Sequence, residues 1–92
     1  MAYFDNEKSD NTWIREFESV SNELDWHRDK NDRSIEVLDG NGWMFQFDNE
    51  LPHFINKGNT VFIPKDTYHR LHKGNDKLII KIEEYENDSE KT

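Results

Sequence analysis

The segment from Gly58 to His69, which reads GNTVFIPKDTYH, constrains the fold of this 92-residue chain more than any other stretch. Its glycine marks a tight turn, residues 60–63 form a short apolar run, and Pro64 ends that run because proline cannot continue a hydrogen-bonded strand. His69 then begins a second strand-forming run. Such a unit can point an imidazole into a small β-barrel, so the segment predicts both a fold and a candidate site.

Turn signals recur at close and regular spacing along the whole chain, which predicts an all-β protein. Asp39-Gly40-Asn41-Gly42 is the strongest of them, since glycine and asparagine accept a positive φ. The expected strands are 33–38, 43–47, 51–55, 60–63, 68–72 and 77–83, with an extended segment at 24–29. Residues 12–20 are ambiguous, since Trp13, Phe17 and Val20 also fit a helical stripe, and we favour a strand or an extended arm there. With no convincing helix, the pattern indicates a sandwich, a jelly roll or a small barrel.

The length of the chain is that of a single domain. We expect residues 1–11 to form a loosely ordered N-terminal segment, 12–84 the barrel, and 85–92 a charged, disordered tail. Trp43, Phe45 and Phe47 share one face of their strand, which is the aromatic filling that a small barrel needs.

Composition excludes several classes of function. The formal charge of −8 argues against nucleic acid and against an anionic membrane surface, because both need clustered Lys and Arg. The absence of cysteine rules out disulfides, thiolate zinc sites and cysteine nucleophiles. No apolar run approaches the roughly 20 residues that span a bilayer, and no signal peptide is visible. We therefore expect a soluble, cytoplasmic protein.

The segment from Gly58 to His69 resembles the second conserved motif of the cupin family. Gly58, Pro64 and His69 match that motif in register, and Asp66 stands where a second glycine is usual. Aspartate is a tolerable substitute there because it visits the turn conformations that glycine favours. The resemblance covers about residues 26–83 and implies a small cupin-type double-stranded β-helix, that is, a jelly-roll-like barrel.

The first cupin motif commonly reads His, any residue, His, three or four residues, then Glu. Here His27 keeps the first histidine, Asp29 replaces the second, and Arg33 stands at the glutamate position. The resemblance implies a divalent metal, Fe, Mn, Zn or Ni, on His27, Asp29 and His69. Residues 27 and 29 of an extended segment point to one face, and two imidazoles with one carboxylate suit Fe(II).

Arg33 stays charged and would repel a dication close to it. If it is buried, it needs a partner such as Asp29, Asp32 or an anionic ligand, because a buried lone charge is costly; the alternative is that it simply points to solvent. As a ligand contact it would anchor a carboxylate or phosphate. Gln46 would contact a ligand only if its face of the strand lines the cavity.

Two functions therefore stay open. One is a cupin-like barrel that binds a small polar or anionic molecule through a divalent metal, whether or not it is an enzyme. The alternative is a metal-free cupin-like binding or structural module without catalytic activity. Such a module would form a homodimer through the edge strand at 51–55, which Pro52 marks.

Overall fold

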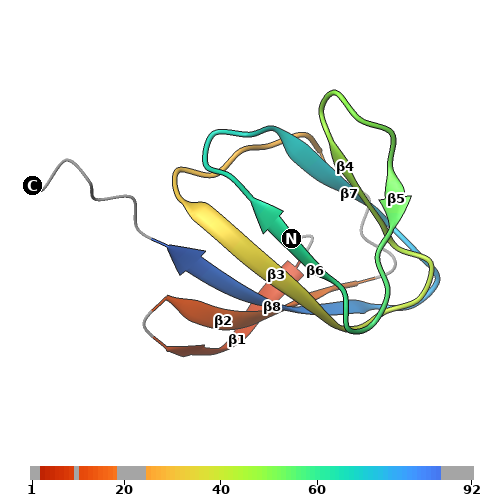
Figure 1. The fold of residues 1–92 in the computed structure, drawn as a ribbon. Coiled ribbons are helices and arrows are strands. Elements are labelled where there is room, and N and C mark those ends of the chain that lie inside the picture. Colours follow the sequence, from red (N-terminus) through yellow and green to blue (C-terminus); the bar gives the residue numbers. More distant parts are fainter. Residues whose placement is uncertain (1–2, 10, 19–24, 86–92) are drawn as a thin grey trace, which may run out of the picture.

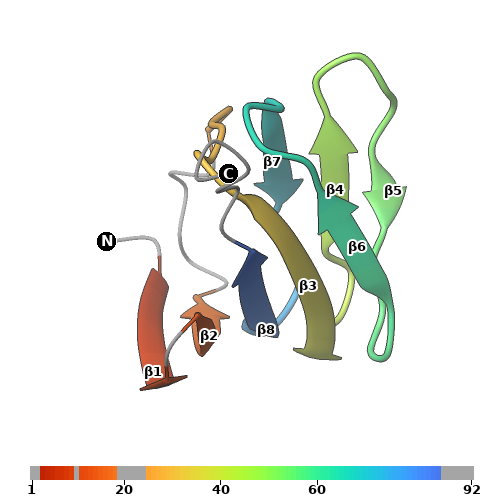
Figure 2. The same cartoon turned by 60° about the vertical axis from the view of Figure 1, so that its left-hand side comes forward.

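Eight strands form two antiparallel sheets in the computed structural model, which describes residues 3–9, 11–18 and 25–85. The strands are β1 (Tyr3–Ser9), β2 (Thr12–Phe17), β3 (Asp32–Asp39), β4 (Met44–Phe47), β5 (His53–Phe54), β6 (Thr60–Ile63), β7 (His69–His72) and β8 (Leu78–Tyr85). One sheet has the order β1-β2-β8-β3-β6 and the other the order β5-β4-β7 (Figures 1 and 2). Within the described ranges no helix is long and apolar enough to cross a membrane.

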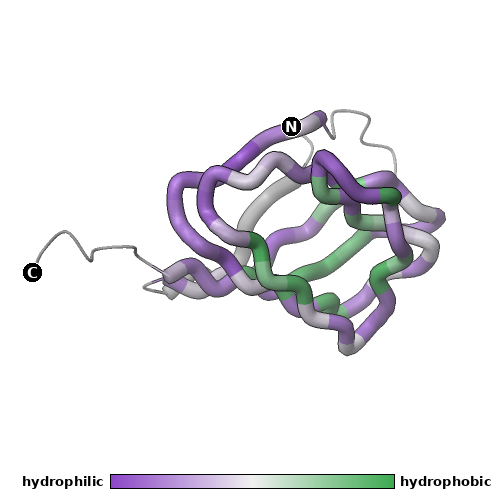
Figure 3. The backbone as a smooth tube through the Cα atoms, turned by 45° about the horizontal axis from the view of Figure 1, so that its top comes forward, coloured by the Kyte–Doolittle hydropathy of each residue, from purple (hydrophilic) through white to green (hydrophobic). Residues whose placement is uncertain are grey.

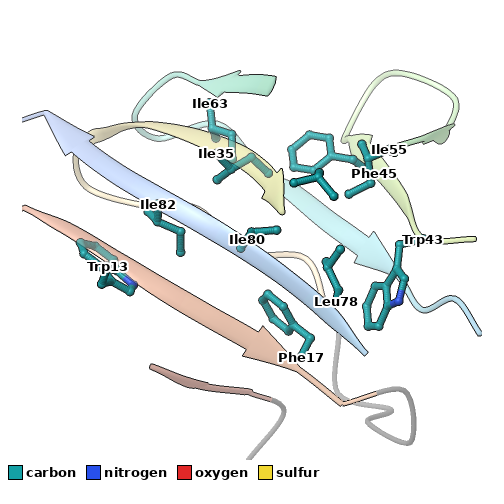
Figure 4. Close-up of a cluster of buried hydrophobic side chains, with 11 residues drawn as sticks. Trp13, Phe17, Ile35, Trp43, Phe45, Ile55, Ile63, Leu78, Ile80 and Ile82 are labelled. Carbon is teal, nitrogen blue, oxygen red and sulfur yellow. The ribbon is translucent and has the colours of Figure 1, made fainter. Parts of the chain in front are cut away.

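The core lies between the two sheets and is filled by a few large side chains. Buried apolar residues come from β2, β3, β6 and β8 on one side and from around β4 and β5 on the other (Figure 4). They are Trp13, Phe17, Ile35, Val37, Trp43, Phe45, Ile55, Ile63, Leu78, Ile80 and Ile82. Figure 3 shows the apolar stretches gathered in the middle of the molecule, with hydrophilic segments around them.

The aromatic stripe of Trp43, Phe45 and Phe47 faces the core, as the alternation along β4 predicts. Trp43 and Phe45 are fully buried, and Phe47 packs against the core from a half-buried position. The Trp43 ring lies 6.1 Å from that of Phe17 in the opposite sheet, and its Nε1 donates a hydrogen bond of 2.6 Å to the Asp76 carbonyl. The stripe therefore joins the two sheets and leaves no buried indole N–H unsatisfied at Trp43.

The predicted all-β single domain is confirmed, and the strand positions agree closely with the expected ones. Two differences stand out at the ends of the chain. Residues 3–9, expected to be loosely ordered, form β1 and pair with β2. The last strand continues to Tyr85, past the expected end at residue 83, because Glu84 and Tyr85 also pair with β3. Residues 19, 20 and 24 of the expected extended segments, and 86–92 of the expected tail, lie outside the described residues.

The predicted turns adopt the backbone conformations that their residues allow. Asp66 has a φ of 60°, which confirms that it takes the left-handed conformation in place of the usual glycine. Gly74 is required for space instead, since an added Cβ would lie 2.6 Å from the Gly42 carbonyl carbon and closer still to the Asn41 oxygen.

β5 forms an edge of the smaller sheet, as Pro52 predicts. Leu51 and Phe54 beside this edge are 86 % and 60 % exposed. Pairing of two copies through this strand stays a prediction.

Candidate metal centre

His27 and His69 lie directly opposite each other because an isolated antiparallel bridge joins their backbones. The His27 N–H donates to the His69 carbonyl at 3.1 Å, and the His69 N–H donates to the His27 carbonyl at 2.9 Å. A third backbone hydrogen bond joins the same two segments: the N–H of Asp66 donates to the Asp29 carbonyl at 2.7 Å. The turn that follows Pro64 thus fastens the segment of the first motif to the start of β7, although the two histidines are 42 positions apart in the sequence.

Three atoms that could ligate a metal, one each from His27, Asp29 and His69, lie within 4.8 Å of one another. The Nδ1 of His27 is 3.0 Å from the Asp25 carbonyl oxygen, and the Nδ1 of His69 is 2.8 Å from the Thr67 carbonyl oxygen. A carbonyl only accepts, so each Nδ1 carries the proton and each Nε2 carries the lone pair. Histidines that bind metals are commonly oriented by such a bond from the other ring nitrogen.

The two oxygens of Asp29 have different surroundings. Oδ1 lies 3.4 Å from Nη1 of Arg33. Oδ2 is buried, has no hydrogen-bond partner among the described residues, and lies 3.5 Å from Nε2 of His69. A carboxylate oxygen therefore faces an imidazole lone pair, and both are acceptors. A bound cation would satisfy both atoms, so the donor set fits a divalent metal.

Burial favours the neutral form of the His69 ring. Its side chain is 5 % exposed, and this burial lowers its pKa below 6.5, against the raising effect of its hydrogen bond to Thr67. His27 and Arg33 lower the pKa further, whereas Asp29 raises it. The stacked ring of Phe45, 5.6 Å away, covers one face of the imidazole. Because His27 is exposed, the group opens to solvent on its side.

Arg33 does not point to solvent. Its Nε lies 3.3 Å from Oε2 of Glu84 on β8, and its guanidinium carbon lies 5.3 Å from the centre of the Trp13 ring. Together with Asp29 these contacts give the half-buried guanidinium two carboxylate partners and an aromatic one. The pair with Asp29, one of the alternatives expected from the sequence, occupies one oxygen and leaves the other to face the histidines.

A cavity of about 300 Å³ opens next to these side chains. Its polar lining consists of Arg15, Asp25, His27, Asp29, Arg33 and His69. The remaining wall is apolar and includes Phe17, Ile35, Phe45, Ile63, Ile80 and Ile82 from both sheets. Arg15 and Glu84 are site residues that the sequence interpretation missed. The alternation of Trp13, Arg15 and Phe17 does place Arg15 on the inward face of β2, but nothing local connects Glu84 with Arg33.

Gln46 lies on the other face of β4 and is not among the residues that line the cavity. Its Oε1 accepts a hydrogen bond of 3.0 Å from Nε of Arg70 and lies 2.8 Å from Nε2 of His72, while its Nε2 donates to the Glu50 carbonyl at 2.9 Å. The condition for its ligand role, that its face line the cavity, is therefore not met. Asp32 is also occupied elsewhere, because its Oδ1 accepts the Lys65 N–H at 2.8 Å.

No protein-family model matches the chain, and no curated protein matches it either. Solved structures do. A cupin-2 domain protein from Shewanella frigidimarina superposes with a TM-score of 0.68 at 19 % identity, over 90 % of this chain and 79 % of that one.

A cupin-like protein from Thermotoga maritima gives a TM-score of 0.59 at 21 % identity, over 79 % of this chain and 56 % of that one. FeII HppE, described with its iron, gives 0.66 at 10 % identity, over 80 % of this chain and 41 % of that one. The fold implied by the second motif is thus confirmed: the described residues form a small domain with the cupin fold.

Proposed function

We propose that the chain binds a small anionic molecule in its cavity, next to a divalent metal held by His27, Asp29 and His69. One observation carries the proposal: one ligand atom each of His27, Asp29 and His69 converge, and within this group the buried, unpartnered Oδ2 of Asp29 faces Nε2 of His69 although both atoms are acceptors. Without a cation these atoms repel one another, and their convergence costs folding free energy. Backbone carbonyls hold both rings in the tautomer that presents the lone pair.

The donor set of two imidazoles and one carboxylate suits Fe(II), and also Mn(II), Zn(II) or Ni(II). Such an ion would supply Lewis-acid polarisation of a bound ligand or a site for oxygen activation. His27 and Asp29 would hold it from the first-motif segment and His69 from β7. The buried side of the site, closed by Phe45, excludes water, while the exposed side at His27 admits the ligand.

Arg33 orients the anionic ligand in this proposal. Glu84 and Asp29 fix its guanidinium, and the residue lines the cavity beside the three proposed metal ligands. A guanidinium presents five N–H donors, so a group held by two carboxylates can still donate to a ligand carboxylate. The positive charge of Arg33 also favours the alternative of a metal-free module. Arg33 stands at the glutamate position of the first motif, so a guanidinium replaces a carboxylate beside the proposed ion.

One experiment separates the two. The chain is purified without an affinity tag, its metal content is measured by elemental analysis, and Mn(II), Fe(II), Zn(II) and Ni(II) are titrated into the metal-free protein. We expect one equivalent of metal per chain, lost in His27→Ala and in His69→Ala. His53→Ala is the matched control, since His53 is exposed on β5 and does not line the cavity.

Loss of metal in the two site variants but not in the control supports the proposal. A folded protein that cannot be loaded with any of the four ions, or one whose metal content survives both substitutions, would refute it and leave the metal-free module.

A further inference from the structure

Glu84 of β8 is linked to the proposed metal ligands through Arg33. The register of β8 with β3 pairs the two residues, so their side chains lie on the same face of neighbouring strands. Nε of Arg33 donates a hydrogen bond of 3.3 Å to Oε2 of Glu84. Nη1 of the same guanidinium lies 3.4 Å from Oδ1 of Asp29. One guanidinium therefore joins the carboxylate of Glu84 to that of a proposed ligand.

The position of this guanidinium is set from β8 and β2. The N–H of Glu84 donates a hydrogen bond of 2.8 Å to the carbonyl of Asn11, just before β2, which fixes the backbone at this point of β8. The Trp13 ring of β2 has its centre 5.3 Å from the guanidinium carbon of Arg33. Arg33, Glu84 and Asp29 are all half-buried, so water screens their ionic contacts less than those of exposed pairs.

The contact between Arg33 and Asp29 uses only part of what such a pair can form. A guanidinium binds a carboxylate most strongly through two parallel N–H···O bonds, one to each oxygen. Here Glu84 holds the guanidinium by Nε, and Nη1 faces a single oxygen of Asp29. The other oxygen, Oδ2, is buried without a hydrogen-bond partner among the described residues and lies 3.5 Å from Nε2 of His69. The arrangement leaves this oxygen for a cation.

Glu84 also lowers the electrostatic cost of a cation beside Arg33. An unpaired guanidinium at the glutamate position of the first motif would repel a dication. The carboxylate of Glu84 pairs with this guanidinium, and the pair is formally neutral. A dication next to Arg33 and Glu84 together therefore meets less repulsion than a dication next to Arg33 alone.

We propose that Glu84 is a positioning residue of the metal centre. It holds Arg33 so that the guanidinium binds one oxygen of Asp29 and leaves the other oxygen for the ion. Without Glu84, Arg33 binds both oxygens of Asp29 and competes with the metal. This inference rests on the proposed function in that it concerns the same three ligands, and it gives a role to a residue that supplies no ligand atom.

The first test measures the affinity for Mn(II) and Zn(II) by calorimetry, in the unmodified chain and in Glu84→Met. Loss of a residue that orients a metal ligand commonly weakens binding about 10–100-fold, so we expect a loss of about 10-fold or more. Glu84→Gln keeps an oxygen that can accept from Nε of Arg33, and it should restore part of the affinity. Glu83→Met is the matched control, because Glu83 is the exposed neighbour in β8 and its Oε1 accepts from the Tyr85 hydroxyl.

Arg33→Met, alone and combined with Glu84→Met, separates positioning from direct attraction of the ion by the Glu84 carboxylate. In the Arg33→Met background, Glu84→Met should change the metal affinity by less than about 2-fold, because no guanidinium is left to hold. A loss of equal size in both backgrounds would mean that the charge of Glu84 acts on the ion directly, and would overturn the inference. Circular dichroism establishes that each variant is folded. If Glu84→Met does not fold, Glu84→Gln with Glu83→Gln as its control carries the same comparison.

Crystal structures of the metal-free unmodified chain and of metal-free Glu84→Met test the inference without any metal. In the variant we expect both oxygens of Asp29 to bind Arg33 at about 2.8 Å, with Oδ2 turned away from Nε2 of His69. An unchanged position of Oδ2 in the variant would overturn the inference. An affinity that is unchanged in Glu84→Met, or lowered as much in Glu83→Met, would do the same.

The two proposals fail separately. An unmodified chain that binds no metal refutes the proposed metal centre, and the two crystal structures then still decide whether Glu84 controls the contact between Arg33 and Asp29. A chain that binds metal equally well with and without Glu84 leaves the metal centre standing and overturns the role of Glu84.

Discussion

Substitution of Asp29 by Asn should make the metal-free protein more stable while abolishing metal binding. In the native chain Oδ2 of Asp29 is buried without a hydrogen-bond partner and faces the Nε2 lone pair of His69 at 3.5 Å. In Asp29→Asn the amide oxygen can still accept from Arg33, and the amide NH₂ can donate to Nε2 of His69 at the same distance. The substitution thus turns two facing acceptors into a donor and an acceptor.

The magnitude follows from two contributions. Relief of an unsatisfied buried acceptor is worth about 2 kcal/mol. The weaker, neutral contact with Arg33 costs about 1 kcal/mol, since that pair is partly exposed. The free energy of unfolding should therefore rise by about 1 kcal/mol, which corresponds to roughly 5 °C in Tm for a domain of this size.

With metal present, the native chain should instead be more stable than Asp29→Asn. At a free concentration of 100 Kd, the ion would stabilise the native protein by about 2.7 kcal/mol and would leave the variant unchanged. The assay is urea unfolding of both proteins, in a chelator and in excess Mn(II) or Zn(II). Asp48→Asn, an equal change of charge at an exposed turn residue, is the control. An Asp29→Asn protein that is less stable than this control in the chelator would refute the account of the site.

Three further results are expected. Burial lowers the pKa of His69 in the folded chain, so below about pH 6.5 the unfolded chain binds more protons than the folded one. The free energy of unfolding should therefore decrease as the pH is lowered through this range. Urea midpoints of the metal-free protein should show this fall, and His69→Gln should make it shallower; an unchanged slope would contradict the assignment. Gly74→Ala should cost at least about 2 kcal/mol because its Cβ would strike the backbone of Asn41, whereas Gly58→Ala, with open space but a φ of 93°, should cost only about 1–2 kcal/mol. Leu78→Ala, at a fully buried position, should cost about 2–5 kcal/mol in the same denaturation assay, and a loss below about 1 kcal/mol would show that the core collapses around it.

Much of the fold follows from local patterns that the sequence displays directly. The alternation in β4 and β8 identifies the buried faces, Pro52 identifies the edge strand, and the turn at Asp66 takes the predicted left-handed conformation. These features depend on a residue and its near neighbours. For the same reason β1 was not expected: its polar sequence carries no alternation, and pairing with β2 forms it.

The candidate site divides along the same line. The motif spacing singled out His27, Asp29 and His69. The turn after Pro64 and the start of β7 fix where the imidazole of His69 lies, and His27 and Asp29 alternate in an extended segment. The spacing left open which residue pairs with Arg33 and whether the face of β4 that carries Gln46 lines the cavity. It also did not reveal Arg15 as a cavity residue. Glu84 reaches Arg33 from 51 positions away, through the register of β3 with β8.

Local sequence patterns were enough to predict most of the strands, the turns and the residue types available for a site. The folded structure was needed to show which oxygen of Asp29 faces His69, that Gln46 lies outside the cavity, and that Arg15 and Arg33 lie against one indole ring. The physical reason is that strand and turn preferences act over a few neighbouring residues. The neighbours of a side chain in the core are instead set by sheet order and register, which bring together residues far apart in the chain.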